Sequence, residues 1–341
     1  STPVEEKLAA IYAQVLGLER VGVDDSFFDL GGNSLLAMQL VAAIHDRFDA
    51  EMPVSALFTA PTVADFANIL CDGNSQGRLE SLEILQRGKG APLFCVHPAG
   101  GVSWPYRALA QELDCSVVGL QDVIGLNGSP PKSLRQMAER HVDQICSTEL
   151  VGPPSILGWS FGGTLAHAIA IEMRRRGLEI GALIILDALP NLNKPLPHAS
   201  SLDWALSNVL RMILRPVAQD LMLERKMLTY AMAQEIANSA KPKFPLPPEW
   251  LCEHMSAAFD RNTKLLSDHQ ADVFEGSLTL ITAGGSPKKT TLANEWSPYV
   301  TGPIVEYDID SRHEDMLDPQ SISKYVPILR RILTERERES A

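Results

Sequence analysis

A serine flanked by glycines follows a short apolar segment. The string Gly158-Trp159-Ser160-Phe161-Gly162 lies between residues 154–157, which suit a buried strand, and a helical pattern from Thr164 to Arg176. Small residues at a strand-to-helix turn let the backbone turn sharply and leave the serine hydroxyl exposed. We therefore predict that Ser160 is a nucleophile at such a turn. The alternative interpretation is a glycine-rich turn that contains a serine by chance.

Two further residues supply the base and the acid that a serine nucleophile requires. Asp187 ends the strand-like segment 181–189, and His313 follows the last strand-like segment in a loop of sequence DSRHEDML. The segment 277–285 ends in two glycines and offers no carboxylate, which leaves Asp187 as the acid. The chain order serine, aspartate, histidine is that of α/β-hydrolases. The sequence therefore predicts a catalytic triad of Ser160, His313 and Asp187.

The glycine-rich segment from His97 to Gly101 follows the first long strand-like segment. In hydrolases with this order of elements, one oxyanion donor is the backbone N–H after the nucleophile and the other comes from the loop after an early strand. We expect the N–H groups of Phe161 and Ala99 in these roles, with Gly100 as an alternative to Ala99. His97 is expected to shape the loop, because the triad is complete without it.

Strand-like and helix-like segments alternate from about residue 79 to the C-terminus. Such alternation predicts a mostly parallel sheet covered by helices on both faces, with ligands at the carboxyl ends of the strands. Residues 82–92 are a candidate for a first strand. The other strands are expected within 92–101, 115–121, 155–159, 181–189, 277–285 and 303–310.

About ninety residues separate the strand-like segments 181–189 and 277–285, far more than an ordinary connection needs. They contain helical patterns rich in Leu, Met and Trp. We predict a helical lid within about 190–275 that covers Ser160 and binds an apolar or mixed acyl chain. A helical cap with a purely structural role is the alternative.

Residues 1–74 form a separate acidic region, with 11 acidic and 3 basic side chains against 31 and 27 in the remainder. Its helical patterns predict a small all-α four-helix bundle. In its longest loop, Phe27 and Phe28 are expected core anchors. Ser34 begins a helix, where free N–H groups favour an anion, although an ordinary N-cap serine is the alternative. The expected helices lie at 4–16, 34–48, 54–58 and 63–70.

The composition is that of an ordinary globular protein, with a net charge of -12, 45% hydrophobic residues and 21% charged residues. It shows no basic footprint for nucleic acid, no apolar run long enough for a bilayer and no signal peptide. The five cysteines are scattered without metal-binding spacing, which indicates reduced thiols. We expect a cytoplasmic, monomeric protein that binds neither nucleic acid, nor membrane, nor metal.

Two sets of motifs resemble known families. The string DSFFDLGGNSLLAMQL resembles the carrier-protein signature, in which the serine bears a 4′-phosphopantetheine arm, and Asn33-Ser34-Leu35 favours the peptidyl carriers of nonribosomal peptide synthetases. The strings HPAGG, GWSFGGTLA, LIILDALP and NEWSPYV resemble type I thioesterases. Together they resemble the C-terminal carrier and thioesterase domains of a nonribosomal peptide synthetase, and in particular of a siderophore assembly enzyme.

The resemblance implies a peptidyl carrier (thiolation) domain at 1–74, a linker at 75–80 and an α/β-hydrolase thioesterase at 81–341. An acyl chain would pass from phosphopantetheine on Ser34 to Ser160 and leave by hydrolysis or macrocyclisation. The implied partners are upstream condensation and adenylation domains, a phosphopantetheinyl transferase and a peptidyl or acyl thioester. Three alternatives remain open: an esterase or lipase-like hydrolase with a fused helical domain, an editing thioesterase, and a non-enzymatic carrier scaffold.

Overall fold

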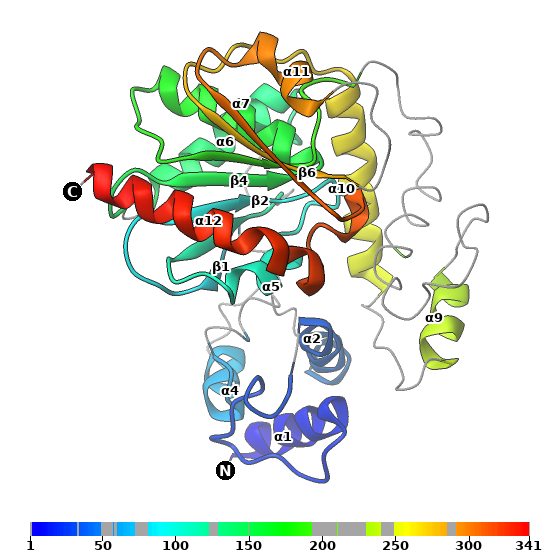
Figure 1. Cartoon of the computed structure of the whole chain (residues 1–341). Coiled ribbons are helices and arrows are strands. Elements are labelled where there is room, and N and C mark those ends of the chain that lie inside the picture. The colour runs from blue at the N-terminus through cyan, green and yellow to red at the C-terminus, as the bar shows by residue number, and fades with distance from the viewer. Residues whose placement is uncertain are drawn as a thin grey trace. The chain divides into compact units, whose positions relative to one another are not determined.

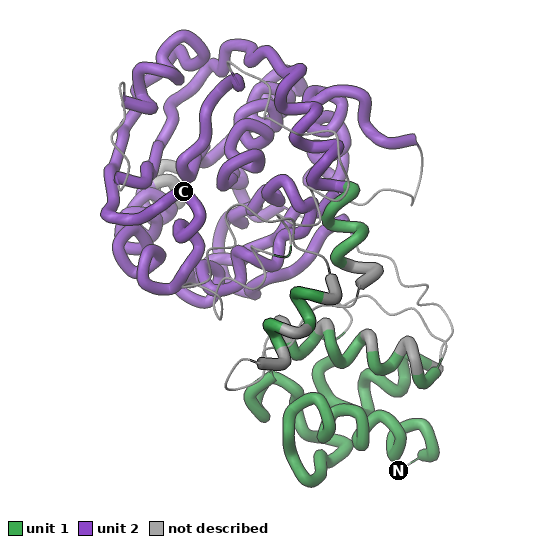
Figure 2. Tube along the Cα trace, turned by 90° about the vertical axis from the view of Figure 1, so that its right-hand side faces the viewer, with its two compact units in different colours: residues 1–80, 200–257 green, residues 81–199, 258–341 purple. Residues whose placement is uncertain are grey.

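The chain forms two compact units, residues 1–80 with 200–257 and residues 81–199 with 258–341 (Figure 2). The expected boundaries at 74 and 80 fall outside the residues that the structure describes, and they stay predictions. This computed structural model describes residues 2–32, 34–48, 57, 60–71, 81–122, 129–148, 150–192, 210, 230–239, 249–284 and 291–340.

Three of the four helices expected in the N-terminal region are present: α1 (Pro3–Leu16), α2 (Ser34–Phe48) and α4 (Val63–Cys71). Helix α1 begins with a capping box, in which Thr2 Oγ1 accepts the N–H of Glu5 at 3.2 Å and the Glu5 carboxylate accepts the N–H of Thr2 at 2.7 Å. The helix expected at 54–58 lies outside the described residues, apart from Leu57. The same unit includes α9 (Tyr230–Ser239).

Phe27 anchors the core of the three N-terminal helices. Its ring is fully buried and meets the ring of Tyr12 edge to face, with 5.6 Å between centroids. Phe28 is half-buried and packs edge to face on Phe27 at 5.4 Å. The long loop between α1 and α2 is therefore held by its two aromatic residues, as its sequence predicts, because burial of one large apolar side chain stabilises a fold by about 1.5–3 kcal/mol.

The larger unit is built on a seven-stranded sheet in the order β1-β3-β2-β4-β5-β6-β7 (Figure 1). Strand β1 pairs with β3 antiparallel, and all other neighbours are parallel. All six expected strands are present, and the candidate first strand is β1. The bounds are β1 Leu82–Gln86, β2 Leu93–Val96, β3 Val117–Leu120, β4 Ser155–Trp159, β5 Leu183–Leu186, β6 Leu278–Ala283 and β7 Ile304–Ile309.

Helices cover both faces of this sheet, as the alternation predicts (Figure 1). One face packs on α6 (Leu134–Cys146), α7 (Phe161–Arg175) and α11 (Leu292–Trp296), and the other on α5 (Arg107–Ala110) and α12 (Pro319–Ser340). Successive strand residues alternate between the faces, so that Ile156 joins the first core and Leu157 the second. The inner strands β2, β4 and β5 are covered on both sides, so their residues are buried and almost all apolar. The edge strand β7 is less covered and includes Glu306 and Asp308.

Some helix bounds differ from expectation. The sequence YRALAQEL at 106–113 has the pattern of one helix, but the structure has a 3₁₀ turn (Trp104–Tyr106) followed by the four-residue α5. Helix α5 ends early because the N–H groups of Glu112 and Leu113 donate to carbonyls three residues back, which tightens the last turn. Helix α7 begins three residues earlier than expected, at Phe161. The helical patterns of the long insertion lie at 201–216, 221–237 and 249–268. The structure has α9 within the second pattern and at its end, and α10 (Glu249–Ser267) in the third, while the first lies almost wholly outside the described residues. Within the described ranges, no helix is both long and apolar enough for a membrane crossing.

Candidate functional site

The three residues predicted to act together meet at the carboxyl ends of the parallel strands. Ser160 follows β4, Asp187 follows β5, and His313 comes after β7. His313 Nε2 lies 3.1 Å from Ser160 Oγ, and His313 Nδ1 lies 2.8 Å from Asp187 Oδ2. The structure thus brings together a hydroxyl, an imidazole and a carboxylate in the order that nucleophilic catalysis by serine requires.

Ser160 has a backbone conformation that non-glycine residues rarely adopt, with φ 56° and ψ −126°. Its N–H donates to Leu186 O at 3.1 Å, which fixes the turn against β5. Gly162 permits the close approach of α7 to β2, because a Cβ at this position would lie 2.4 Å from Val96 O. A strained residue of this kind persists only where its surroundings hold it, at a cost of about 1–3 kcal/mol.

Asp187 is also held in a left-handed conformation, with φ 43°. Its N–H donates to Ile281 O at 2.9 Å, and its Oδ1 accepts the N–H of Ala283 at 3.0 Å. The backbone of β6 therefore fixes one carboxylate oxygen, and the other faces His313. The chain beyond Asp187 is held as well, because Trp296 Nε1 donates to Ala188 O at 2.8 Å.

The hydrogen-bond partners of His313 determine its tautomer. A carboxylate only accepts, so Nδ1 carries the proton and Nε2 presents its lone pair to the hydroxyl of Ser160. The ring lies against the ring of Trp159 at 5.4 Å between centroids, and Trp159 Nε1 donates to His313 O at 3.0 Å. The imidazole side chain is 45% exposed, so it can reach both the serine and solvent.

Tyr106 supports the same edge of the sheet, although sequence reasoning missed it. Its buried hydroxyl accepts the N–H of Trp159 and donates to Val96 O, both at 2.8 Å. Burial raises the pKa of this hydroxyl well above its usual value, so it stays protonated. Tyr106 therefore joins the ends of β2 and β4 at the residue that precedes Ser160. A tyrosine beginning a weak amphipathic segment carried no sequence signal for this role.

The two N–H groups expected to bind the oxyanion belong to Phe161 and Ala99. Phe161 is the first residue of α7, and Ala99 lies in the loop after β2. Among the described residues, no oxygen accepts a hydrogen bond from the N–H of either one. Pro98 O in the same loop accepts the N–H of Gly101 at 2.9 Å and faces His97 Nδ1 at 2.8 Å. Two N–H groups are thus available to an anionic oxygen.

His97 and His141 form a buried pair behind this loop. Their Nε2 atoms are 3.3 Å apart, and His141 Nδ1 lies 2.8 Å from Gln144 Oε1. Burial lowers the pKa of both imidazoles, that of His141 to about 4, so both are neutral at pH 7. The ring of His97 stacks on that of Phe161 at 5.7 Å. Its one contact in the loop is to Pro98 O, which suits the loop-shaping role expected from the sequence.

Ser34 is the first residue of α2, a helix of 15 residues. The loop before it folds onto Phe27, whose carbonyl accepts the N–H of Gly32 at 2.9 Å. Only glycine fits there, because a Cβ on Gly32 would lie 2.3 Å from the Phe27 ring. Asn33 lies outside the described residues. This loop delivers the chain to a helix N-terminus, whose free N–H groups and positive dipole end fit a phosphodiester.

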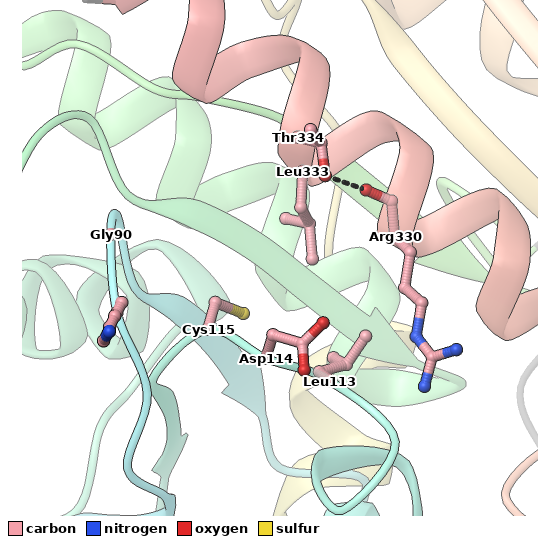
Figure 3. A pocket seen from close by; sticks show the side chains of 8 residues that line it. Gly90, Leu113, Asp114, Cys115, Arg330, Leu333 and Thr334 are labelled. Carbon is pink, nitrogen blue, oxygen red and sulfur yellow. Dashed lines mark hydrogen bonds between the residues drawn. The ribbon is translucent and has the colours of Figure 1, made fainter.

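A pocket of about 230 Å³ lies at the opposite edge of the sheet (Figure 3). Its lining includes Lys89, Cys115, Arg330 and Leu333. The first two precede β2 and β3, whereas Ser160 follows β4, so the pocket is remote from the triad. In the described part of the chain, no three His, Cys, Asp or Glu side chains gather as metal ligands would.

Comparisons with known proteins match both regions. Residues 91–320 match the thioesterase domain family, and residues 6–70 match the phosphopantetheine attachment site family. The chain is 36% identical over 334 residues to a dimodular nonribosomal peptide synthase of Bacillus subtilis strain 168, covering 96% of this chain and 14% of that protein. It is 31% identical over 353 residues to enterobactin synthase component F of Escherichia coli K12, covering 96% and 24%.

The fold of the larger unit has solved counterparts. The NocB thioesterase domain, in covalent complex with a fluorophosphonate nocardicin G analogue, matches with a TM-score of 0.53 at 24% identity, over 72% of this chain and 96% of that one. This likeness shows the fold of the larger unit. The chain spans a quarter or less of the length of the two synthetases named above.

Proposed function

The chain belongs to the thioesterase domain family and also carries a phosphopantetheine attachment domain, and from this premise we propose that it is the terminal carrier and chain-releasing thioesterase of a nonribosomal peptide synthetase. The observation that carries the proposal is the hydrogen-bonded series Ser160, His313, Asp187 at the carboxyl edge of the sheet. The proposed plan is a carrier at 1–74, a linker at 75–80 and a thioesterase at 81–341.

The covalent 4′-phosphopantetheine arm supplies the acyl chain as a thioester, and we assign its attachment to Ser34 at the start of α2. In the first half-reaction, Ser160 Oγ attacks the thioester carbonyl carbon while His313 Nε2 takes the hydroxyl proton. The new C–O bond forms, the C–S bond breaks, and His313 returns the proton to the leaving sulfur. Asp187 stabilises the imidazolium that exists between these two proton transfers.

The backbone N–H groups of Phe161 and Ala99 are proposed to bind the oxyanion that forms during this attack. Neither N–H has an acceptor among the described residues, so both donors are ready before the substrate arrives. Such preorganised donors stabilise developing charge without reorganisation, and the loss of one typically lowers kcat by about 10²–10³-fold.

In the second half-reaction, His313 removes a proton from the attacking group, which is water in hydrolysis or a hydroxyl or amine of the acyl chain in macrocyclisation. The attacking atom bonds to the acyl carbon, the ester bond to Ser160 breaks, and His313 gives the proton to Ser160 Oγ. Both outcomes use the same three side chains, so the choice depends on how the inserted segment at about 190–275 folds the acyl chain and excludes water.

The proposed partners follow from this position in an assembly line. They are upstream condensation and adenylation domains, a phosphopantetheinyl transferase and a peptidyl or acyl thioester. The identity to enterobactin synthase component F supports a siderophore as the class of product.

Two measurements test the proposal. Incubation with coenzyme A and a broad-specificity phosphopantetheinyl transferase should add about 340 Da, the mass of the arm, and Ser34→Ala should abolish the gain. A fluorophosphonate should label wild-type protein at Ser160 and leave Ser160→Ala unlabelled. No mass gain would remove the carrier and leave a serine hydrolase of the esterase type. A mass gain without labelling would leave a carrier fused to an inert fold.

A further inference from the structure

The loop that carries Ala99 is tied to a helix far along the chain. Asn262 of α10 is fully buried, and its Nδ2 donates to Ala99 O at 3.0 Å and to Asp122 Oδ2 at 3.1 Å. Two acceptors at one nitrogen fix the orientation of the amide. Asn262 Oδ1 has no partner among the described residues, which lowers stability. The contribution of this side chain is therefore its donation to the two oxygens.

Asp122 connects the same amide to the other end of the loop. Its N–H donates to Gly101 O at 2.8 Å, and its carboxylate forms a buried ion pair with Arg261. Burial raises the pKa of the Asp122 carboxyl, but the charge of Arg261 and the hydrogen bonds from Arg261 and Asn262 act against it, so the pKa is lowered and the group is ionised at pH 7. The ionised carboxylate is a strong acceptor that keeps Asn262 in place.

The loop backbone also touches α10 directly. Gly101 has φ 80°, and a Cβ there would lie 2.9 Å from the Cβ of Ala258. Ala258, Arg261 and Asn262 are spaced three and four residues apart, so they lie on one face of the helix. That face supports the loop directly at Gly101 and Ala99, and Arg261 supports it through Asp122.

These contacts determine the peptide planes on both sides of Ala99. In a trans peptide the C=O and the following N–H point in opposite directions. Pro98 O faces inward to His97 Nδ1 and the N–H of Gly101, so the N–H of Ala99 points away from them. Rotation of the Ala99 N–H would break both bonds of Pro98 O, because the two groups belong to one peptide plane. Ala99 O faces Asn262, which fixes the next peptide plane and with it the place of the Ala99 Cα between the two planes.

We infer that Asn262, braced by Asp122 and Arg261, is a positioning residue for thioester release that holds the Ala99 N–H in the orientation needed to bind the oxyanion. The inference rests on the proposed function and deepens it. It makes the last helix of the inserted segment part of the apparatus that stabilises the transition state. Asn262 acts through the loop and touches no reacting atom.

The test uses the full chain with Asn262→Ala and Asn262→Leu, the second of which keeps the branched shape of the side chain without its donors and acceptor. Thr263→Val is the matched control, because Thr263 is buried on the same helix but its hydroxyl bonds only to Phe259 O and Asp260 O of that helix. The substrate is an acetyl thioester of N-acetylcysteamine, with thiol release followed by absorbance. The Kd of phenylboronic acid is also measured, because its adduct with a serine hydroxyl places an oxygen in the oxyanion hole.

Both Asn262 variants should lower kcat by about 10- to 100-fold with KM within about twofold, somewhat less than removal of a donor. The Kd of phenylboronic acid should rise by a similar factor. Thr263→Val should keep kcat and Kd within about twofold, because it leaves the contacts of the Ala99 loop in place. This split between kcat and KM would not arise from a general loss of stability.

Full kcat in either folded Asn262 variant would overturn the inference, and so would an equal loss in Thr263→Val. Suppose that a fluorophosphonate labels Ser160 of the wild-type protein, that this protein releases thiol, and that an Asn262 variant releases thiol at the same rate. This result would refute the positioning role alone. Wild-type protein that is neither labelled nor active would refute the proposed function, and this inference with it.

Discussion

Helices α6 and α7 pack against each other on one face of the sheet, and each begins after a serine (Figure 1). Ser133, before α6, has an extended backbone with φ −151°, and its Oγ accepts the N–H of Gln136 at 3.1 Å. Ser160, before α7, has φ 56°, makes no such bond and faces His313 instead. The same residue in the same place is a structural cap in one helix and the proposed nucleophile in the other.

The difference shows that the turn at Ser160 lacks the side-chain cap that α6 has. A capping hydroxyl accepts one of the free N–H groups in the first turn of its helix. In α7 the N–H equivalent to that of Gln136 belongs to Gly163, and it donates to the backbone oxygen of Ser160 at 2.9 Å instead of to the hydroxyl. The absence of a side-chain cap therefore leaves the hydroxyl of Ser160 to face His313 Nε2.

The largest expected effect is that of Ser160→Ala. Removal of the hydroxyl should lower kcat for an N-acetylcysteamine thioester by about 10⁶-fold, because no other nucleophile lies against His313 among the described residues. The comparison requires that Ser133→Ala, assayed in parallel, keep its activity. Thiol release near the wild-type rate from Ser160→Ala would show that both serines are structural.

Asp187→Asn should reduce kcat by about 10⁴-fold. The amide oxygen can still accept the N–H of Ala283, so the loop should keep its shape, but an NH₂ group facing His313 Nδ1 disfavours the tautomer that Ser160 needs. The rate of labelling by a fluorophosphonate, followed by intact mass, measures this directly. A loss of less than tenfold, in a variant with an unchanged melting temperature, would mean that His313 is oriented by other contacts.

The two helices also each bury a histidine, His141 in α6 and His167 in α7. Burial lowers the pKa of both to about 4, whereas an unfolded chain has a histidine pKa of about 6.5. Between these values the unfolded chain binds more protons, so this contribution to stability is present above pH 6.5 and is lost as the pH falls toward 4. Each histidine changes the free energy of unfolding by up to about 1.4 kcal/mol per pH unit, which amounts to about 3 kcal/mol for one histidine over the whole interval.

His167→Gln tests this contribution, because glutamine can still donate to Tyr299 O, which His167 Nε2 faces at 3.0 Å, but it does not titrate. The free energy of unfolding, measured in urea at pH 7 and at pH 4.5, should fall less steeply in the variant, by about 2 kcal/mol over the interval. An unchanged pH dependence would mean that His167 titrates normally. His141 should then be tested alone, because its partners are the side chains of His97 and Gln144.

Much of the fold could be predicted because its signals are local. The inner strands are short, almost wholly apolar and separated by helical patterns. The candidate triad follows from a serine and an aspartate directly after two strands and a histidine in the loop after the last one. The strand-to-helix turn at Ser160 was recognisable because a glycine stands two residues before the serine and another two residues after it. The N-terminal helices and the roles of Phe27 and Phe28 were equally visible.

The parts that escaped prediction depend on contacts between residues distant in sequence. Asn262 contacts Ala99, which lies 163 positions earlier in the chain, and Tyr106 connects Val96 with Trp159. No spacing in the sequence predicts either contact. Helix bounds also depended on packing. Helix α7 begins directly after the turn because its early glycines pack against the sheet, although glycine disfavours a helix in isolation.

The smallest predicted effect completes the comparison. Ser133→Ala should lower the free energy of unfolding by about 1 kcal/mol, because it removes the acceptor for one N–H in the first turn of α6. Its kcat should not change, and Ser133→Asp, which restores an acceptor and adds a charge that the helix dipole favours, should recover the stability. Urea unfolding and thiol release on the same samples measure both. A fall in the kcat of Ser133→Ala would show that α6 affects the loop that carries Ala99. The two are connected, because His141 of α6 contacts His97, which faces Pro98 O in that loop.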